Sequence, residues 1–548
     1  MEAETILVGG AIFSAGMRTS RPGGVAVSEG RIVAVGDDAD LAGLRGPRTE
    51  VVDLRGGLLL PGFQDAHVHP IMGGVTMLAC DLHGATSAED ALRLVGEYAT
   101  ANPDVPWIVG AGWSMEHFAG GTPTRQQLDR AVPDRPAYLT NRDGHGAWVN
   151  TAALDRAAIT AGTPDPADGR IERDEDGSPA GTLHEGAVEL VARLKPPVTA
   201  ADQTAGLLAA QDHLLALGIT AWQDAAVGEA LGQADLLPIY LAAARSGTLL
   251  ARVRGALWWD RARSSGQIGD LVERRAGGQV GRFAPTTVKI MLDGVAENHT
   301  ASMLEPYLDG CGCSTGNNGL RFVDPVGLRE YVTRLDAEGF QVHFHALGDR
   351  AVRDALDALA VARAVNGPSR ARHHLAHLQV VHPHDIARFA ELDATANIQA
   401  LWAAHEPQMD ELTIPFLGEQ RAQLQYPFAD IAAAGGALAA GSDWSVSSAN
   451  PLDGIHVAVN RVAPDAEPGT PPLASRNALD LATAMTAYTA GSARVNGLDA
   501  RTGRLAEGLL ADLCVLDRDP FDGPSDQIAT ARVASTWIDG RRVFSAGD

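Results

Sequence analysis

The sequence predicts an α/β fold, a TIM-like (β/α)8 barrel with a small composite β-sandwich domain formed by both chain ends and an insertion over the barrel mouth. Three observations lead to this prediction. Strand-like runs alternate with helix-like runs through the centre of the chain, which is typical of parallel βα units. Short β-rich runs occur near both chain ends. A segment rich in Gly, Pro and Asp, residues 150–185, interrupts the alternation.

The two ends of the chain contain short runs typical of β hairpins. Residues 4–54 hold several such runs, and residues 511–544 hold more, two of them joined by an Asp-Gly turn at Asp539. Small β pieces of this kind are rarely stable alone. We therefore expect residues 1–60 and 495–548 to pack together as one composite β-sandwich domain.

The predicted barrel occupies residues 61–494, and seven of its strands can be identified. They begin near residues 62, 219, 287, 341, 374, 394 and 437. A closed barrel of this type requires an eighth strand. The two candidates, each in the second position, are Trp107–Gly110 and Ala137–Thr140. Both lie within residues 80–190, which are predicted to carry the insertion.

Composition excludes several classes of partner. The 548 residues include 44 basic and 68 acidic residues, giving a net charge of −24. The negative field of such a protein disfavours binding to nucleic acid and to anionic membranes.

Four cysteines are too few for a disulfide framework in this chain. We find no signal peptide and no window with the ~18 apolar residues of a membrane span. The sequence predicts a cytoplasmic protein, with a homodimer as an open alternative for its assembly.

A candidate metal site begins in the run LLLPGFQDAHVHP, residues 58–70. A Pro-Gly turn there precedes a strand-like segment that ends in His67 and His69. Side chains repeat their direction every second residue along a strand, so the two imidazoles face the same way. Two neutral imidazoles side by side form half of a divalent metal site. A histidine pair on a solvated strand end is the alternative, and only further ligands can decide between them.

Further candidate ligands follow at later strand ends. Barrel enzymes build their sites at the C-terminal ends of strands. These ends supply Lys289 on the fourth strand, His345 on the fifth, His377 on the sixth and Asp443 on the eighth. His343 shares the face of His345 but lies deeper, so we expect it to be a hydrogen-bonded core histidine. The convergence of these groups with the first pair of histidines predicts a metal site.

Lys289 needs an explanation, because an ammonium group has no lone pair for a metal. As an isolated cation inside an apolar barrel it would also be costly. One interpretation pairs it with Asp293 or another acid. The other is that its amine has reacted with carbon dioxide to give a carbamate, a carboxylate on a long arm that could bridge two divalent ions.

These motifs resemble those of the amidohydrolase superfamily, and more closely amidohydrolase family 3, the group of N-substituted formamide deformylase. The resemblance covers nearly the whole chain and rests on PGFQDAHVH, DGHGAWVN, GITAWQDA, VKIMLDGV, HFHALGDRAV, AHLQ and GSDWSV. It implies two divalent metal ions, for which zinc suits the ligands best. In such a centre His67 and His69 would bind the more buried ion, carboxylated Lys289 would bridge, His345 and His377 would bind the second ion, and Asp443 would contact a metal and act as general base and acid.

The resemblance further implies a hydrolase that cleaves a non-peptide C–N bond in a small, hydrophobic, formamide-like N-substituted amide. The ions would activate a water, and Asp443 would move its proton to the leaving nitrogen. The alternatives are a cyclic amide, imide or carbamate hydrolase and a deaminase. Lys289 argues against a deaminase, because deaminases of this superfamily generally use one metal. A metal-free scaffold protein would be expected to have lost ligands, and none is lost.

Four residues are predicted to contact the substrate. His145, in DGHGAW, is expected near the barrel mouth as a substrate or oxyanion contact, with a backbone-bonded loop histidine as the alternative. Trp113 and Trp402 would form an aromatic wall for the amine side of the substrate, or would pack a core or lid. His405, after the seventh strand, could line the pocket.

Overall fold

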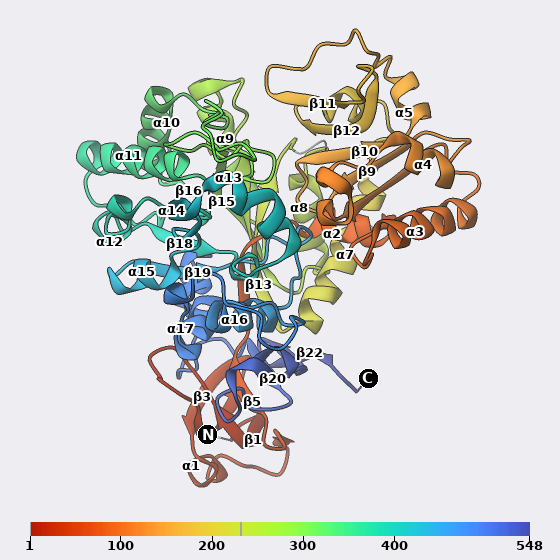
Figure 1. Cartoon of the computed structure of the whole chain (residues 1–548). Helices are drawn as coiled ribbons and strands as arrows, with labels where there is room; N and C mark the ends of the chain where they lie inside the picture. The colour runs from red at the N-terminus through yellow and green to blue at the C-terminus, as the bar shows by residue number, and fades with distance from the viewer. Residues whose placement is uncertain (1, 231–232, 548) are drawn as a thin grey trace.

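The central element is a barrel of parallel strands (Figure 1). A computed structural model describes residues 2–230 and 233–547, and within these residues eight strands lie in the order β19-β18-β17-β16-β15-β14-β13-β6. Their bounds are β6 (Phe63–Val68), β13 (Ile219–Val227), β14 (Arg252–Trp258), β15 (Phe283–Met291), β16 (Gln341–Ala346), β17 (His374–His377), β18 (Thr395–Ile398) and β19 (Ala437–Ala440). The predicted fold class is confirmed.

The barrel closes between its first and last strands, just beyond the end of β19. The Asp443 amide donates to the His67 carbonyl oxygen at 2.8 Å, and the His69 amide donates to the Trp444 carbonyl oxygen at 2.7 Å. Gly441 permits this close approach, because a Cβ at that position would lie 2.6 Å from the His67 amide nitrogen. The closure places the carboxyl ends of β6 and β19 side by side.

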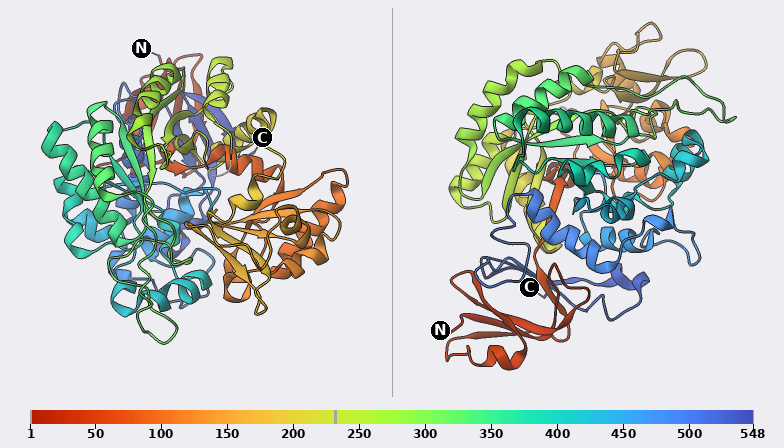
Figure 2. Two further views of the ribbon diagram at one scale, coloured as in Figure 1. Left: turned by 90° about the horizontal axis from the view of Figure 1, so that it is seen from above. Right: turned by 90° about the vertical axis from the view of Figure 1, so that its left-hand side faces the viewer.

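Helices cover the outside of the barrel, as the view from above shows (Figure 2). They include α7 (Ala200–Ala216), α8 (Leu237–Ser246), α9 (Ile268–Gly278), α10 (Pro325–Ala337), α11 (Asp349–Asn366), α15 (Phe428–Ala433) and α16 (Pro451–Asn460). α11 illustrates the packing, since its buried Val352, Leu356 and Leu359 recur at helical spacing on one face. Because strands such as β13 are covered on both faces, they are buried along their whole length.

Between β6 and α7 the chain passes through α2 (Pro70–Met77) and then forms the insertion, a separate layer drawn in orange beside the barrel in Figure 1. Its six-stranded sheet lies within described residues 80–185 and has the order β11-β12-β10-β9-β8-β7. The bounds are β7 (Cys80–Asp81), β8 (Ile108–Trp113), β9 (Ala137–Asn141), β10 (Gly146–Val149), β11 (Gly169–Arg173) and β12 (Pro179–Glu185), with helices α3 (Ala88–Ala101), α4 (Arg125–Ala131) and α5 (Thr151–Arg156). Two apolar clusters of its own hold this layer together.

The prediction for the eighth barrel strand is wrong. Both candidate segments, Trp107–Gly110 and Ala137–Thr140, belong to the insertion, in β8 and β9. The missing barrel strand is β14, in the third position. Its sequence RVRGALW contains two arginines, which hide a buried strand from an analysis of hydrophobic pattern. Arg252 is only 5% exposed, and its charge is compensated by Asp512 at 2.7 Å.

The two chain ends form one β domain at the bottom of Figure 1, where both termini lie. Among the described residues the sheet order is β22-β21-β20-β5-β1-β2-β3, with β4 paired to β1. The bounds are β1 (Thr5–Ile12), β2 (Arg21–Ser28), β3 (Arg31–Gly36), β4 (Glu50–Asp53), β5 (Leu58–Pro61), β20 (Leu513–Leu516), β21 (Val533–Ile538) and β22 (Arg541–Ser545). Antiparallel pairing of β5 with β20 joins the two halves immediately before β6 begins.

Short helices complete the described chain. They are α1 (Asp38–Ala42), α6 (Glu189–Ala192), α12 (Arg388–Glu391), α13 (Ile414–Leu417), α14 (Glu419–Ala422), α17 (Leu481–Thr486) and α18 (Ser492–Val495). Within the described residues, no helix combines the length and the apolar character that crossing a bilayer requires.

Candidate metal centre

His67, His69 and Asp443 form a buried cluster where β6 and β19 meet. One ligand atom from each lies within 4.8 Å of the others. Oδ1 of Asp443 is 3.1 Å from Nε2 of His69 and 3.3 Å from Nε2 of His67. The alternation along β6 places both histidines on one side, and the seam beyond β19 delivers the carboxylate to them.

The other three predicted ligands lie beside this cluster. Lys289 Nζ, from β15, is 3.3 Å from Nε2 of His67. The ring of His377, at the end of β17, has its centroid 4.8 Å from that of His67 and 4.5 Å from that of His345 on β16. His377 Nδ1 is also 3.7 Å from Asp443 Oδ2. The structure therefore brings all six candidate ligands to one end of the barrel.

Unpaired polar atoms show that these residues fit a metal ion. Among the described residues, neither ring nitrogen of His377 has a hydrogen-bond partner, although the residue is only 1% exposed. Asp443 Oδ1 accepts no hydrogen bond either. An unsatisfied buried polar group costs about 1–3 kcal/mol, and a cation would satisfy the carboxylate oxygen and one of the two imidazole nitrogens. Imidazole and carboxylate donors are a ligand set that divalent transition metals prefer.

The protonation states suit metal binding. Burial and the nearby Lys289 lower the pKa of His67 to about 3, so its imidazole is neutral and keeps a lone pair. Burial opposes the charge of Asp443, but the neighbouring His67 and His69 outweigh it and hold the pKa of that carboxyl well below its usual value. The cluster thus presents a neutral imidazole on His67 and an ionised carboxylate on Asp443.

Lys289 is enclosed, and among the described residues it has no acidic partner. The residue is 3% exposed, and no carboxylate of the described chain lies within ion-pair distance of it. Asp293, one predicted partner, instead accepts the amides of Ser302, Leu347 and Gly348 and lies 3.2 Å from Nδ1 of His345. Burial lowers the pKa of Lys289 to about 7. A substantial fraction of the amine is therefore neutral near pH 7, and a neutral amine is the form that reacts with carbon dioxide.

A chain of buried hydrogen bonds holds the His67 ring through its Nδ1 atom. Its Nδ1 is 2.9 Å from Nε2 of His343, whose Nδ1 is 2.8 Å from Oε1 of Gln223. His343 is thus the hydrogen-bonded core histidine that the sequence predicts. Asp65 also supports His67, because its carboxylate accepts the His67 amide at 2.9 Å. Sequence reasoning missed both Gln223 and Asp65. The sequence indicated only that both polar residues lie inside predicted strands. A polar residue in a strand can have many other roles, so this position alone does not predict a contact with the site.

Two of the predicted substrate contacts lie beside the cluster. The indole of Trp402 stacks on the ring of His377, with centroids 5.3 Å apart and planes at 4°. The His145 ring, carried by the loop between β9 and β10, has its centroid 5.8 Å from that of His345. Its Nδ1 is 3.0 Å from Oε2 of Glu185.

The other two predicted contacts are placed differently. Trp113 is fully buried in a cluster of the insertion with Trp148 and donates its indole N–H to the Leu139 carbonyl oxygen at 2.8 Å. It packs a core, so the expectation of an aromatic pocket wall does not hold for this residue. His405 lies 2.6 Å from Asp410 on the loop after β18 and is partly exposed.

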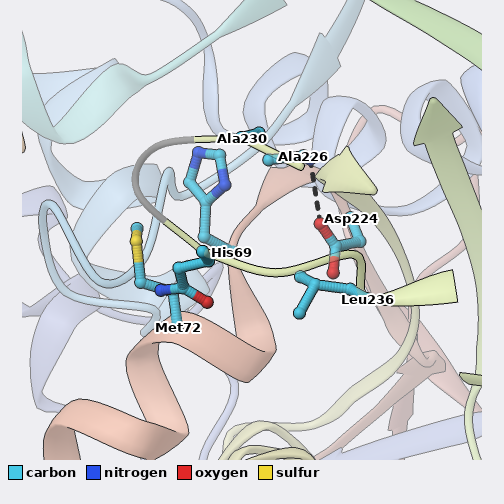
Figure 3. A pocket seen from close by; sticks show the side chains of 7 residues that line it. His69, Met72, Asp224, Ala226, Ala230 and Leu236 are labelled. Carbon is cyan, nitrogen blue, oxygen red and sulfur yellow. Dashed lines mark hydrogen bonds between the residues drawn. The ribbon is translucent and has the colours of Figure 1, made fainter. Parts of the chain in front are cut away.

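A small cavity adjoins the cluster on the side of His69 (Figure 3). Its volume is about 10 Å³, room for roughly one water molecule. The lining residues are His69, Met72, Asp224, Ala226, Ala230, Gln233 and Leu236. Asp224 is held in place by the Ala226 amide, the bond dashed in Figure 3, and by the Tyr240 hydroxyl at 2.6 Å.

Known proteins share this architecture. Residues 50–544 match a family model described as Amidohydrolase family. The chain is 29% identical over 548 residues to Protein LONG AFTER FAR-RED 3 from Arabidopsis thaliana, covering 99% of this chain and 92% of that protein. It is 28% identical over 536 residues to N-substituted formamide deformylase from Arthrobacter pascens, covering 95% of each. A solved structure, an uncharacterized metal-dependent hydrolase from Pyrococcus furiosus, is similar with a TM-score of 0.69 and 27% identity, covering 94% of this chain and 99% of that one.

Proposed function

Because this chain belongs to the amidohydrolase family, whose members include metal-dependent hydrolases, we propose that it hydrolyses the C–N bond of a small, hydrophobic, linear N-substituted amide, with a formamide favoured. The observation that carries this proposal is the convergence of six buried candidate ligands with unpaired atoms on His377 and Asp443. The likeness to N-substituted formamide deformylase over 95% of both chains supports the choice of substrate.

The proposed centre holds two divalent ions, with zinc favoured. His67 and His69 would hold one ion, and His345 and His377 would hold the other. Lys289 would carry a carbamate, formed from its neutral amine and carbon dioxide with release of one proton, and would add a carboxylate to the ligand set. Bound ions would supply Lewis-acid chemistry, lowering the pKa of a water and polarising the substrate carbonyl.

The remaining chemistry falls to the chain's own side chains. Asp443, ionised in its buried position, accepts a proton from the attacking water as the oxygen bonds to the carbonyl carbon. It then donates that proton to the amide nitrogen as the C–N bond breaks, and the amine and the carboxylic acid leave. His145 faces the negative charge that develops on the carbonyl oxygen.

The proposed group on the amide nitrogen follows from an aromatic wall of the site. Trp402 offers an aromatic face beside His377, which suits an aryl or alkyl group on the amide nitrogen. His405, on the segment that carries Trp402, is proposed to line the outer part of the pocket. We propose a cytoplasmic enzyme whose partner is a small amide, with neither nucleic acid nor membrane as a partner and with a homodimer as its candidate assembly.

A substrate panel tests the proposal. Purified protein, supplied with zinc and bicarbonate, is incubated with N-aryl and N-alkyl formamides, a cyclic imide, a carbamate and an aminopurine, and amine or ammonia release is measured. Amine release from formamides is the expected result. Turnover of the cyclic imide, the carbamate or the aminopurine in place of the formamides would overturn it in favour of those reactions.

A further inference from the structure

Of the two predicted site residues in the insertion, His145 and Trp113, only His145 lies beside the cluster, whereas all six candidate ligands come from the barrel. The backbone of Glu185, at the end of β12, fixes its position. The Glu185 amide donates to the His145 carbonyl oxygen at 2.9 Å, and the next pair along, Gly146 and His184, lies in register between β10 and β12. The two residues are therefore held together before any side-chain contact is considered.

The Glu185 carboxylate also joins the insertion to the barrel. Its Oε2 lies 3.0 Å and its Oε1 3.2 Å from Nδ1 of His145. Oε1 accepts a second hydrogen bond, at 2.8 Å, from the hydroxyl of Thr300. Thr300 belongs to the barrel loop after β15, and its oxygen accepts the Val295 amide at 2.9 Å. One buried carboxylate thus binds the insertion's histidine and the loop that follows the strand of Lys289.

This contact settles which ring nitrogen of His145 is available. Nδ1 faces the carboxylate and carries a proton toward it. Among the described residues, Nε2 has no hydrogen-bond partner, and the ring lies 5.8 Å from that of His345. The carboxylate of Glu185 pairs with the ring at 3.0 Å, which favours an imidazolium with a proton on each nitrogen, so Nε2 also has a proton to donate.

We propose that Glu185 is a positioning residue that holds His145 through Nδ1, so that Nε2 donates to the carbonyl oxygen of the substrate as that oxygen becomes negatively charged. The insertion thereby supplies the oxyanion donor for a centre built by the barrel. This inference rests on the amide hydrolysis proposed above, and it adds a role for Glu185 and Thr300 that the ligand set does not require.

The chain contains a matched control. Glu172 and His184 form a second histidine–glutamate pair in the same sheet, with Oε1 and Nε2 3.0 Å apart. Glu172 belongs to β11, and its pair does not include a residue of the centre. Loss of this pair is expected to remove a histidine–glutamate contact of similar length from the same sheet while leaving the His145–Glu185 contact in place. An effect on catalysis shared by both pairs would therefore be structural.

The experiment compares wild type with Glu185→Ala, His145→Gln, the double variant, Thr300→Val and Glu172→Gln. Steady-state kinetics on an N-substituted formamide, bound metal and affinity for a phosphonamidate that mimics the tetrahedral intermediate are measured. We expect Glu185→Ala and His145→Gln each to lower kcat about 10- to 100-fold. KM and bound metal should change little, and phosphonamidate affinity should fall in parallel with kcat. Thr300→Val should show a smaller loss of the same kind.

The double variant is decisive, because Glu185 acts through His145. It should be no slower than His145→Gln alone. Three results would each overturn the positioning role. They are a double variant whose loss of kcat is the product of the two single losses, an equal loss of kcat in Glu172→Gln, and loss of bound metal in Glu185→Ala. Inactivity of the wild type toward amides would instead refute the proposed function. In that event ¹⁵N NMR of the His145 ring tests the linkage alone, and an Nδ1 proton that is equally protected in Glu185→Ala overturns it.

Discussion

Ser442 donates its hydroxyl to Asp65 at 2.6 Å, across the seam between the last and first strands of the barrel. The carboxylate of Asp65 also accepts the amides of Ser442 and His67. Burial raises the pKa of Asp65 to about 7, and the hydrogen bonds from Ser442 and His67 oppose this effect. The ionised carboxylate therefore depends on these donors. The segment that carries Asp443 and the strand that carries His67 therefore share one support.

Ser442→Ala should loosen this support and weaken metal binding. Removing one donor from a buried carboxylate costs about 1–3 kcal/mol, and loss of a residue that orients a ligand lowers metal affinity about 10- to 100-fold. Zinc titration with a competing chelator measures the affinity. Ser448→Ala is the control, because Ser448 is exposed and bonds to Asp453. Equal affinities in the two variants would contradict the prediction.

Lys289→Arg should abolish the proposed carbamate, because a guanidinium stays charged and does not react with carbon dioxide. We expect more than about 100-fold lower activity, with binding of the second metal ion lost. Incubation with ¹³C-bicarbonate should give the wild type, and not the variant, a carbamate carbon signal in NMR. A signal of equal intensity in both proteins would show that the label lies on another group.

Gly441→Ala should misplace Asp443, because the added Cβ would meet the His67 amide nitrogen at 2.6 Å and neither strand can move freely. Overpacking of a buried site costs about 1–3 kcal/mol. Thermal unfolding and metal content measure the effect. Gly96→Ala, in α3 with open space around it, is the matched control and should be neutral or slightly stabilising. A fully metallated, equally stable Gly441→Ala protein would refute the close-approach argument.

Metal-free protein should lose stability as the pH falls below 6.5. His67 has a pKa of about 3 when folded and 6.5 ordinarily, so between these values the unfolded chain binds a proton that the folded chain does not. The free energy of unfolding then decreases on acidification, by up to about 1.4 kcal/mol per pH unit from this group. Urea unfolding between about pH 4.5 and 6.5 should give the wild type a slope steeper than that of His67→Asn by about one proton. Parallel slopes would rule out a neutral His67.

Trp402→Ala should reduce discrimination in favour of N-aryl amides. Aromatic contacts are worth about 0.5–1.5 kcal/mol beyond burial, so the ratio of kcat/KM for N-aryl over N-alkyl formamides should fall about 2- to 10-fold. Trp113→Phe provides the comparison, because Trp113 packs inside the insertion. A change in this ratio in Trp113→Phe and not in Trp402→Ala would reverse the assignment of the aromatic wall.

Periodicity could single out the candidate ligands because each of them lies at or near the carboxyl end of a strand. The alternation along β6 and the rule that barrel sites lie at carboxyl ends of strands are local patterns, and they were enough to group His67, His69, Lys289, His345, His377 and Asp443. Neither pattern depends on knowing which strand follows which. The omission of β14 therefore did not disturb the predicted site.

Features set by distant contacts were not predictable in this way. The arginines of β14 look solvent-exposed until Asp512, from the C-terminal end of the chain, is placed beside Arg252. Trp113 lies at the end of a strand and Trp402 shortly after one, but the strand of Trp113 belongs to the insertion, where this position is part of a packed core. The contact of Glu185 with Thr300 joins two layers whose relative placement no local pattern contains.

The pairing of β5 with β20 has a consequence for biosynthesis. β5 lies directly before the first barrel strand and pairs with β1 on one side, but its partner on the other side, β20, emerges from the ribosome only near the end of translation. Until then the nascent polypeptide presents an unpaired apolar edge, Leu58 to Pro61, which invites association with other chains. Chaperone dependence during synthesis, and aggregation of variants truncated before β20, are the expected costs of closing the β domain last.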